Sequence, residues 1–231
     1  MKYGVRTMGE QELKSLETKN KILAATGRML RDKSFDQLTV RNICDEAEAA
    51  YGSFYHHFGN KQGVLFSYAK QQFETMLAAN PIPAEIARTD YIRRILWKYM
   101  VYGKFCERVG KPMVAYLYQN CSEDILLSTC LHGHIVPELM QAAESGYLRI
   151  DREGVTLRNI LEDIPILLCG VMLYWSNKAP EGSQSSLCLL LERIMFRFLY
   201  GFSTEKNQVH FPTEEYLFSD DPDKWLSRIQ S

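Results

Sequence analysis

The sequence predicts an all-helical protein, and three observations support this. Apolar residues recur at intervals of three and four in one segment after another, whereas the alternating pattern of strands is hard to find. Pro and Gly interrupt the chain at 80–83 and 110–112, between periodic segments. The 231 residues, 46% hydrophobic and 24% charged, are typical of a globular chain of one or two domains. This composition excludes collagen-like, disordered and membrane-embedded classes.

The first third of the chain contains four predicted helices. The first begins near 17–18 and carries its inner apolar stripe at Ile22, Ala25, Thr26, Met29 and Leu30. Thr39 is the expected N-cap of a two-turn helix, and Asn60 that of a longer helix that ends before Asn80. Between them lies a short helix over 51–58. We expect these helices to form one domain.

The rest of the chain contains a second set of predicted helices, over 91–109, 113–120, 125–131, 137–145, 157–177 and 185–200. The last two are apolar on nearly every side, and one small domain cannot bury that much apolar helix surface. We therefore expect a homodimer through 157–177 and 185–200, with a central helix pair inside one subunit as the alternative. The expected domains are residues 1–80, with a core at 17–66, and residues 81–231.

The charge is unevenly distributed, although the net charge is only −1. Residues 1–70 hold 11 Lys and Arg against 8 Asp and Glu, while residues 71–231 hold 16 against 20. A mildly basic first third is compatible with an anionic partner such as nucleic acid, but most segments of this charge are simply solvated surface. Without a secretory signal or a long apolar stretch, we expect a cytoplasmic protein with no membrane contact and with reduced cysteines.

Two short helices at 40–47 and 51–58, joined by a turn of three or four residues, have the layout of a helix-turn-helix. Small residues at the start of the second helix allow its backbone to approach bases or phosphates, and the phenols and imidazoles around them can bond phosphate oxygens. The residues expected to contact double-stranded DNA are Thr39, Arg41, Tyr51, Gly52, Ser53, Tyr55, His56, His57 and Lys61.

Some of these aromatic residues have a purely structural interpretation. Aromatic side chains near a helix end often pack onto the next helix, and for Phe58 this is the better interpretation. His56 fits packing and DNA contact equally well.

The run TVRNICDEA at 39–47, followed by YGSFYHHFGNK at 51–61, resembles the DNA-binding domain of TetR-family transcriptional regulators. The similarity covers about 17–66. It implies a homodimeric regulator, a repressor by family default, that binds a palindromic operator and is released by a small-molecule effector. Glu48 stands where the family usually has Gly, and Ala50 where a side-chain cap is common. These departures leave open a TetR-like regulator that has lost operator binding and acts through a protein partner.

The second domain is rich in aromatic residues and Met, which are most often core. In an effector domain, part of this set would line an apolar pocket. The candidate ligand-binding residues are Trp97, Tyr102, Tyr116, Met172 and Trp175.

The sequence offers no catalytic or metal-binding constellation. His132-Gly133-His134 near Cys130 invites a metal interpretation, but a zinc site needs further ligands, and a surface turn is the better prediction. No nucleophile motif is present. We therefore expect no enzymatic activity, no catalytic residue, no metal and no cofactor.

Overall fold

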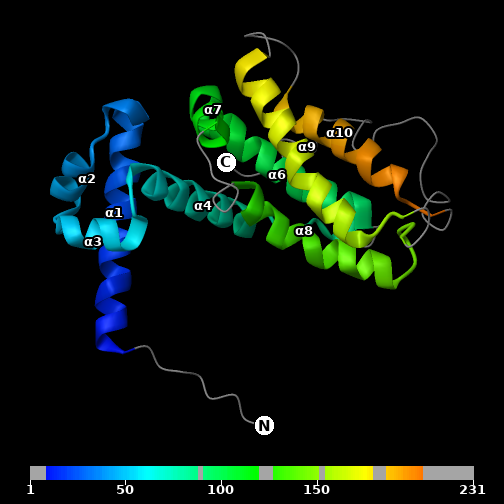
Figure 1. Cartoon of the computed structure of the whole chain (residues 1–231), viewed down its shortest axis with the longest axis horizontal. Coiled ribbons are helices and arrows are strands. Elements are labelled where there is room, and N and C mark those ends of the chain that lie inside the picture. Colours follow the sequence, from blue (N-terminus) through cyan, green and yellow to red (C-terminus); the bar gives the residue numbers. More distant parts are fainter. Residues whose placement is uncertain (1–8, 88–90, 120–126, 151–153, 179–185, 205–231) are drawn as a thin grey trace. The chain divides into compact units, whose positions relative to one another are not determined.

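The computed structural model describes residues 9–87, 91–119, 127–150, 154–178 and 186–204. Helices joined by short turns make up these ranges, with one isolated β-bridge between Leu148 and Ser203 (Figure 1). The prediction of an all-helical fold is therefore confirmed. The chain divides into two compact units, Met1–Gln71 and Gln72–Ser231. The division falls inside α4, which continues to the residue before Asn80.

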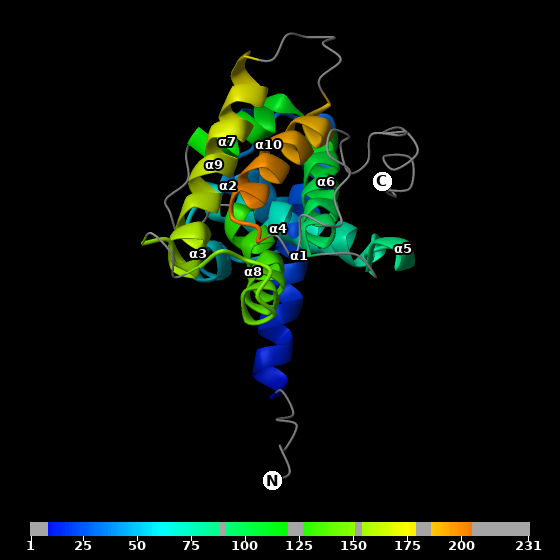
Figure 2. The ribbon, with the colours of Figure 1, turned by 90° about the vertical axis from the view of Figure 1, so that its right-hand side faces the viewer.

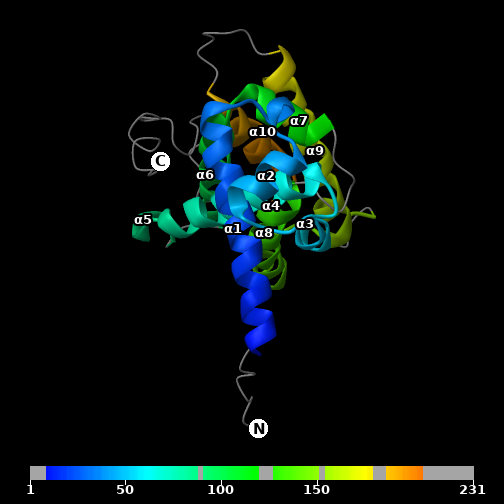
Figure 3. The same ribbon diagram turned by 90° about the vertical axis from the view of Figure 1, so that its left-hand side faces the viewer.

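The first unit is built around three helices that pack against one another (Figure 3). Its elements are α1 (Glu10–Asp32), the 3-10 turn η1 (Phe35–Gln37), α2 (Val40–Ala47), α3 (Tyr51–Phe58) and the start of α4 (Lys61–Ala79). Each helix contributes to one apolar core that includes Ile22, Ala25, Leu38, Ile43, Phe54, Phe58 and Val64. This core is what holds the short helices α2 and α3 in place.

The first helix is longer than the sequence pattern predicts. It begins at Glu10 instead of near 17–18. The Glu12 carboxylate accepts a hydrogen bond from the Gly9 N–H at the helix start, and Lys14 pairs with Glu10 one turn away. Polar local contacts of this kind stabilise a helix that buries nothing, so apolar periodicity could not reveal these first turns.

The second unit has α6 in its middle. Its elements are the end of α4, α5 (Ala84–Ala87), α6 (Tyr91–Val109), α7 (Lys111–Gln119), α8 (Leu127–Glu144), α9 (Leu157–Lys178) and α10 (Leu187–Gly201). Helix α6 packs against α7, α8 and α10, and α9 packs against the same three helices (Figure 2). Helix α6 is buried along most of its length, so its neighbours are arranged around it.

One prediction for this unit is wrong. The segments predicted at 125–131 and 137–145 are not separate helices joined by a surface turn at His132-Gly133-His134. From Leu127 to Glu144 the chain forms the single helix α8, which continues through Pro137, while residues 125–126 lie outside the described ranges. Proline removes one intrahelical hydrogen bond and normally kinks or ends a helix. The carbonyl that loses this bond is that of Gly133, and tertiary contacts hold the helix on both sides of the proline: Lys98 Nζ donates to the His134 carbonyl at 2.6 Å and bonds the Glu138 carboxylate on the following turn.

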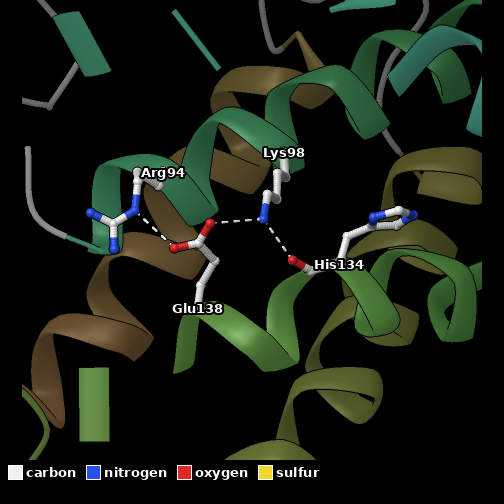
Figure 4. A network of polar contacts seen from close by, with 4 residues as sticks. All are labelled: Arg94, Lys98, His134 and Glu138. Carbon is white, nitrogen blue, oxygen red and sulfur yellow. Dashed lines mark hydrogen bonds and ion pairs between the residues drawn. The ribbon is translucent and has the colours of Figure 1, made fainter. Parts of the chain in front are cut away.

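A charged cluster joins α6 to α8. Arg94 Nε lies 2.8 Å from one oxygen of Glu138, and Lys98 Nζ lies 3.0 Å from the other (Figure 4). All three side chains are largely buried. Burial raises the pKa of the Glu138 carboxyl, but the hydrogen bonds and charges of Arg94 and Lys98 outweigh it and hold that pKa below its ordinary value of 4.5.

This cluster makes the stability of the protein depend on pH. Because the pKa of Glu138 is lower in the folded than in the unfolded chain, its contribution is present above pH 4.5 and is lost as the pH falls through the lowered value. We expect Glu138→Gln to lower the free energy of unfolding by about 2 kcal/mol at neutral pH and by much less in strong acid. Urea denaturation at both pH values measures this.

Glu162→Gln is the matched control, because Glu162 bonds Arg158 at 2.7 Å on the exposed face of α9. Exposed pairs contribute little. An equal loss of stability in the two variants, or a loss at Glu138 that does not change with pH, would contradict this role of the cluster.

Candidate nucleic-acid interface

Two phenylalanines attach α3 to the core of the first unit. Phe54 and Phe58 are 0% and 7% exposed, while Tyr51 and Tyr55 on the other side of the helix are 45% and 53% exposed. Each pair is separated by four residues, which places its members on the same face of a helix. The interpretation of Phe58 as a packing residue is confirmed, and the two tyrosines face outward.

The turn between α2 and α3 has the strain that its sequence predicts. Thr39 caps α2 by accepting a hydrogen bond from the Asn42 N–H at 3.1 Å. At the other end of α2, Glu48 has φ 51° and ψ 42°, the left-handed conformation that glycine adopts most readily. Ala50, which precedes α3, supplies no side-chain cap. Residues with a Cβ lose about 1–2 kcal/mol in the left-handed conformation.

The turn between α3 and α4 depends on a glycine that sequence reasoning missed. Asn60 caps α4 as expected, because its Oδ1 accepts a hydrogen bond from the Gly63 N–H at 2.7 Å. A Cβ added at Gly63 would lie 2.0 Å from the Phe58 carbonyl oxygen. Glycine therefore lets α4 start directly against the end of α3. Gly63 lies three residues after the N-cap Asn60, and this spacing is the sequence signal that could have revealed its role.

Two cations flank α3 in the sequence and differ in how they are held. Lys61 Nζ lies 4.3 Å from the centre of the Phe35 ring and 3.4 Å from the Asp36 carbonyl oxygen. These contacts fix its ammonium group at the start of α4. Arg41 on α2 is exposed and only loosely paired with Asp45 at 3.9 Å. Its guanidinium is therefore available to another anion.

The two histidines of α3 have different surroundings. His56 is exposed and His57 is half-buried, with their ring centres 5.1 Å apart. Burial lowers the pKa of His57, and the nearby charges of His56 and Lys19 lower it further. His57 is thus neutral at pH 7 and can take part in hydrogen bonds without adding charge. Lys19, on the outer side of α1, is a cation near α3 that the motif did not include.

All nine residues proposed for DNA contact belong to the first unit, at the start of α2, in α3 and at the start of α4. Ser53, His57 and Lys61 are half-buried, and the other six, Thr39, Arg41, Tyr51, Gly52, Tyr55 and His56, are exposed. The set therefore presents hydroxyl, imidazole and cationic groups around a helix start made of small residues.

The residues proposed for a ligand pocket lie in the second unit and are mostly core. Trp97, Tyr102, Met172 and Trp175 are buried, and Tyr116 is half-buried. Tyr102 shares a hydrogen bond with Tyr118, and Lys111 lies over the Trp175 ring. Of the five, Trp97 lines a cavity between α4, α6 and α8.

Comparison with known proteins identifies the first unit. Residues 22–68, which include most of α1, all of α2 and α3 and the start of α4, match the family of bacterial regulatory proteins named tetR. The match covers this DNA-binding segment of the chain. No curated protein matches its sequence.

Solved structures of tetR-family regulators share this fold. The Thermus thermophilus repressor FadR, solved in complex with lauroyl-CoA, has a TM-score of 0.56 at 20% identity, over 80% of this chain and 95% of its own. A candidate tetR-family regulator from Shewanella sp. PV-4 has a TM-score of 0.51 at 18% identity, over 81% and 98% of the two chains. At such identities the likeness shows a common fold.

Two other features are absent from the described part of the chain. No three His, Cys, Asp or Glu side chains gather there as metal ligands. None of the described helices has the length and apolar content that crossing a membrane requires.

The strained turn between α2 and α3 can be tested at Glu48. We expect Glu48→Gly to raise the free energy of unfolding by about 1 kcal/mol, because glycine adopts the left-handed conformation without a Cβ clash. Glu48→Ala is the control, since it removes the same charge but keeps the Cβ. Urea denaturation compares the variants, and an equal effect of Gly and Ala would show that charge, not backbone strain, decides the result.

Proposed function

We propose that this protein is a sequence-specific DNA-binding regulator, a repressor, in which α3 enters the major groove. The observation that carries the proposal is the division of α3 into two faces, with Phe54 and Phe58 in the core and Tyr51 and Tyr55 outside. A major groove about 12 Å wide admits a helix. A helix anchored by one face can present the other to base edges and phosphates.

The residues around α3 have distinct proposed roles. Gly52 and Ser53 let the helix start approach the DNA closely. The hydroxyl groups of Tyr51, Tyr55 and Thr39 and the imidazoles of α3 bond phosphate oxygens, and the fixed ammonium group of Lys61 adds a charge contact. Arg41 contacts a guanine edge or a phosphate. Most of the affinity then comes from phosphates and falls steeply with salt.

A second copy of the chain is the proposed partner of α9 and α10. Ile166 and Tyr174 on α9 are 71% and 54% exposed, and a Cβ at Gly170 would meet nothing within 4 Å. These residues follow one another at intervals of four and so form one uncovered face. A symmetric dimer places two recognition helices about 34–36 Å apart, or at a related spacing, which suits a palindromic operator.

The second unit is the proposed site of a small-molecule effector. A ligand that favours one arrangement of the recognition helices changes operator affinity roughly 5- to 150-fold for a coupling of about 1–3 kcal/mol, and DNA changes ligand affinity by the same factor. The structure of FadR with lauroyl-CoA supports a ligand-responsive role at the level of the fold. Since double-stranded DNA is the proposed partner, we propose that the protein acts in the cytoplasm.

The DNA-binding proposal is tested by an anisotropy titration with the promoter DNA beside the gene. We expect Tyr55→Ala to weaken specific binding about tenfold, because a phosphate hydrogen bond is lost. Lys61→Ala should weaken binding to all sequences and reduce the salt slope by about 1.

Lys70→Ala is the control for charge alone. Lys70 is exposed on α4, about 14 Å along the helix axis from Lys61, and its loss changes the net charge equally. If Tyr55→Ala and Lys61→Ala leave a specific, salt-sensitive interaction unchanged, or if Lys70→Ala has the same effect as Lys61→Ala, the site is wrongly assigned.

The proposed dimer is tested at Ile166. We expect Ile166→Glu to convert the dimer to a monomer in light scattering, because a carboxylate would be buried against its own copy. Met140→Glu introduces the same change at an exposed residue of α8 and should leave the dimer intact. A monomeric parent protein, or a dimer unaffected by Ile166→Glu, would exclude this interface.

A further inference from the structure

A cavity of about 240 Å³ lies in the second unit, where the end of α4 and the turn after it meet α6 and α8. Leu77, Pro81, Ile82 and Trp97 make its apolar walls, and Glu74, Lys98 and His134 contribute charged or polar groups. The function proposed above assigns no ligand chemistry to this cavity. Three polar groups beside an apolar wall indicate a ligand with a polar end and an apolar body.

We propose that this cavity binds a small organic acid, whose carboxylate takes hydrogen bonds from Lys98 and His134. The proposal rests on the ligand-responsive role above, and names the chemical class of the effector. The carboxylate of the ligand replaces that of Glu74, which bonds His134 in the structure described here.

The ammonium group of Lys98 is fixed at the cavity with one donor to spare. It donates to the His134 carbonyl oxygen at 2.6 Å and to Glu138 Oε1 at 3.0 Å (Figure 4). A lysine has three N–H donors, so one has no acceptor among the described residues. Lys98 lines the cavity, so this donor is available to the carboxylate of a ligand there.

The second donor is the imidazole of His134, which points away from the Glu138 carboxylate (Figure 4). His134 Nε2 lies 3.1 Å from Glu74 Oε2. An ionised carboxylate only accepts hydrogen bonds, so Nε2 carries the proton and donates it. His134 and Glu74 are 39% and 40% exposed, and Glu74 can therefore turn toward water when another carboxylate takes its place.

The charge at the cavity favours an anion over a cation. Lys98 belongs to a cluster in which Arg94 and Lys98 supply two positive charges and Glu138 one negative charge. The carboxylate of a ligand would balance this excess, whereas an amine would increase it. At the same cavity the Glu74 carboxylate bonds His134 in the structure described here, so a carboxylate fits that place.

The apolar walls and the volume indicate what part of a ligand the cavity covers. A space of about 240 Å³ equals the volume of about eight water molecules, which suits a short apolar body. Trp97 is fixed there because its Nε1 donates to the Asn80 carbonyl oxygen at 3.2 Å. An aromatic or short aliphatic monocarboxylic acid suits these walls and this volume.

Ligand binding of this kind would remove a contact between α4 and α8. Glu74 lies on α4, the helix that begins in the DNA-binding unit at Lys61. The pair Glu74–His134 joins this helix to α8, and displacement of Glu74 ends it. The acid and the operator are therefore expected to affect each other's affinity by equal factors.

The experiment is isothermal titration of the full chain with three probes of one carbon skeleton, 3-phenylpropionate, 3-phenylpropanol and 3-phenylpropylamine. We expect the acid to bind at least about tenfold more tightly than the alcohol or the amine, because it alone accepts both charge-assisted bonds. Equal or tighter binding of the amine or alcohol, or no binding of the acid in the millimolar range, overturns the proposal.

Variants then locate the site. Lys98→Met and His134→Ala should each weaken acid binding about tenfold, and Glu74→Gln should strengthen it, because the competing charge is gone. Lys104→Met is the matched control, since Lys104 lies on the same helix and pairs with Glu107 outside the cavity. His134 is half-exposed, so its variant folds even where Lys98→Met does not. Unchanged acid affinity in both His134→Ala and Glu74→Gln overturns the site.

Operator binding by the ligand-free chain separates this proposal from the function on which it rests. If the ligand-free chain binds an operator but does not bind the acid, only the ligand assignment is wrong. If the acid binds at the cavity and no operator is bound, the DNA-binding proposal fails while the site remains.

Discussion

The insertion of Phe54 and Phe58 into the core of the first unit is the constraint on which the candidate interface depends. A helix of eight residues is not stable alone in water, so α3 exists only because these two rings pack with Ile22, Ile43 and other core residues. Helical periodicity then fixes which side chains face outward. The caps at Thr39 and Asn60 start the neighbouring helices at defined residues, and so preserve this register.

The second unit uses charged contacts to connect helices that apolar packing alone does not orient. Glu138 receives Arg94 and Lys98 from α6, and this holds α8 in one helix through Pro137. Glu74 and His134 form a weaker and more exposed pair between α4 and α8. The buried cluster is therefore structural, whereas the exposed pair can be exchanged for a ligand at little cost.

The sequence predicted most of the helices, because their apolar periodicity is strong and their ends carry local signals. The predicted bounds of α6, Tyr91–Val109, agree with the structure. The start of α1 was missed because its first turns bury nothing, and the continuity of α8 because tertiary contacts override the effect of Pro137. The pairing of Lys98 with Glu138 joins residues 40 positions apart, which no local pattern contains.

The central claim is that α3 is held as a surface helix in order to read double-stranded DNA. Enrichment of duplexes from a random-sequence library by the purified protein tests it most directly. The account predicts a palindromic sequence whose half-sites lie about one helical turn apart or at a related spacing, and whose binding weakens with salt. Failure to enrich any duplex, together with capture of a protein partner through the same face of α3, would contradict it.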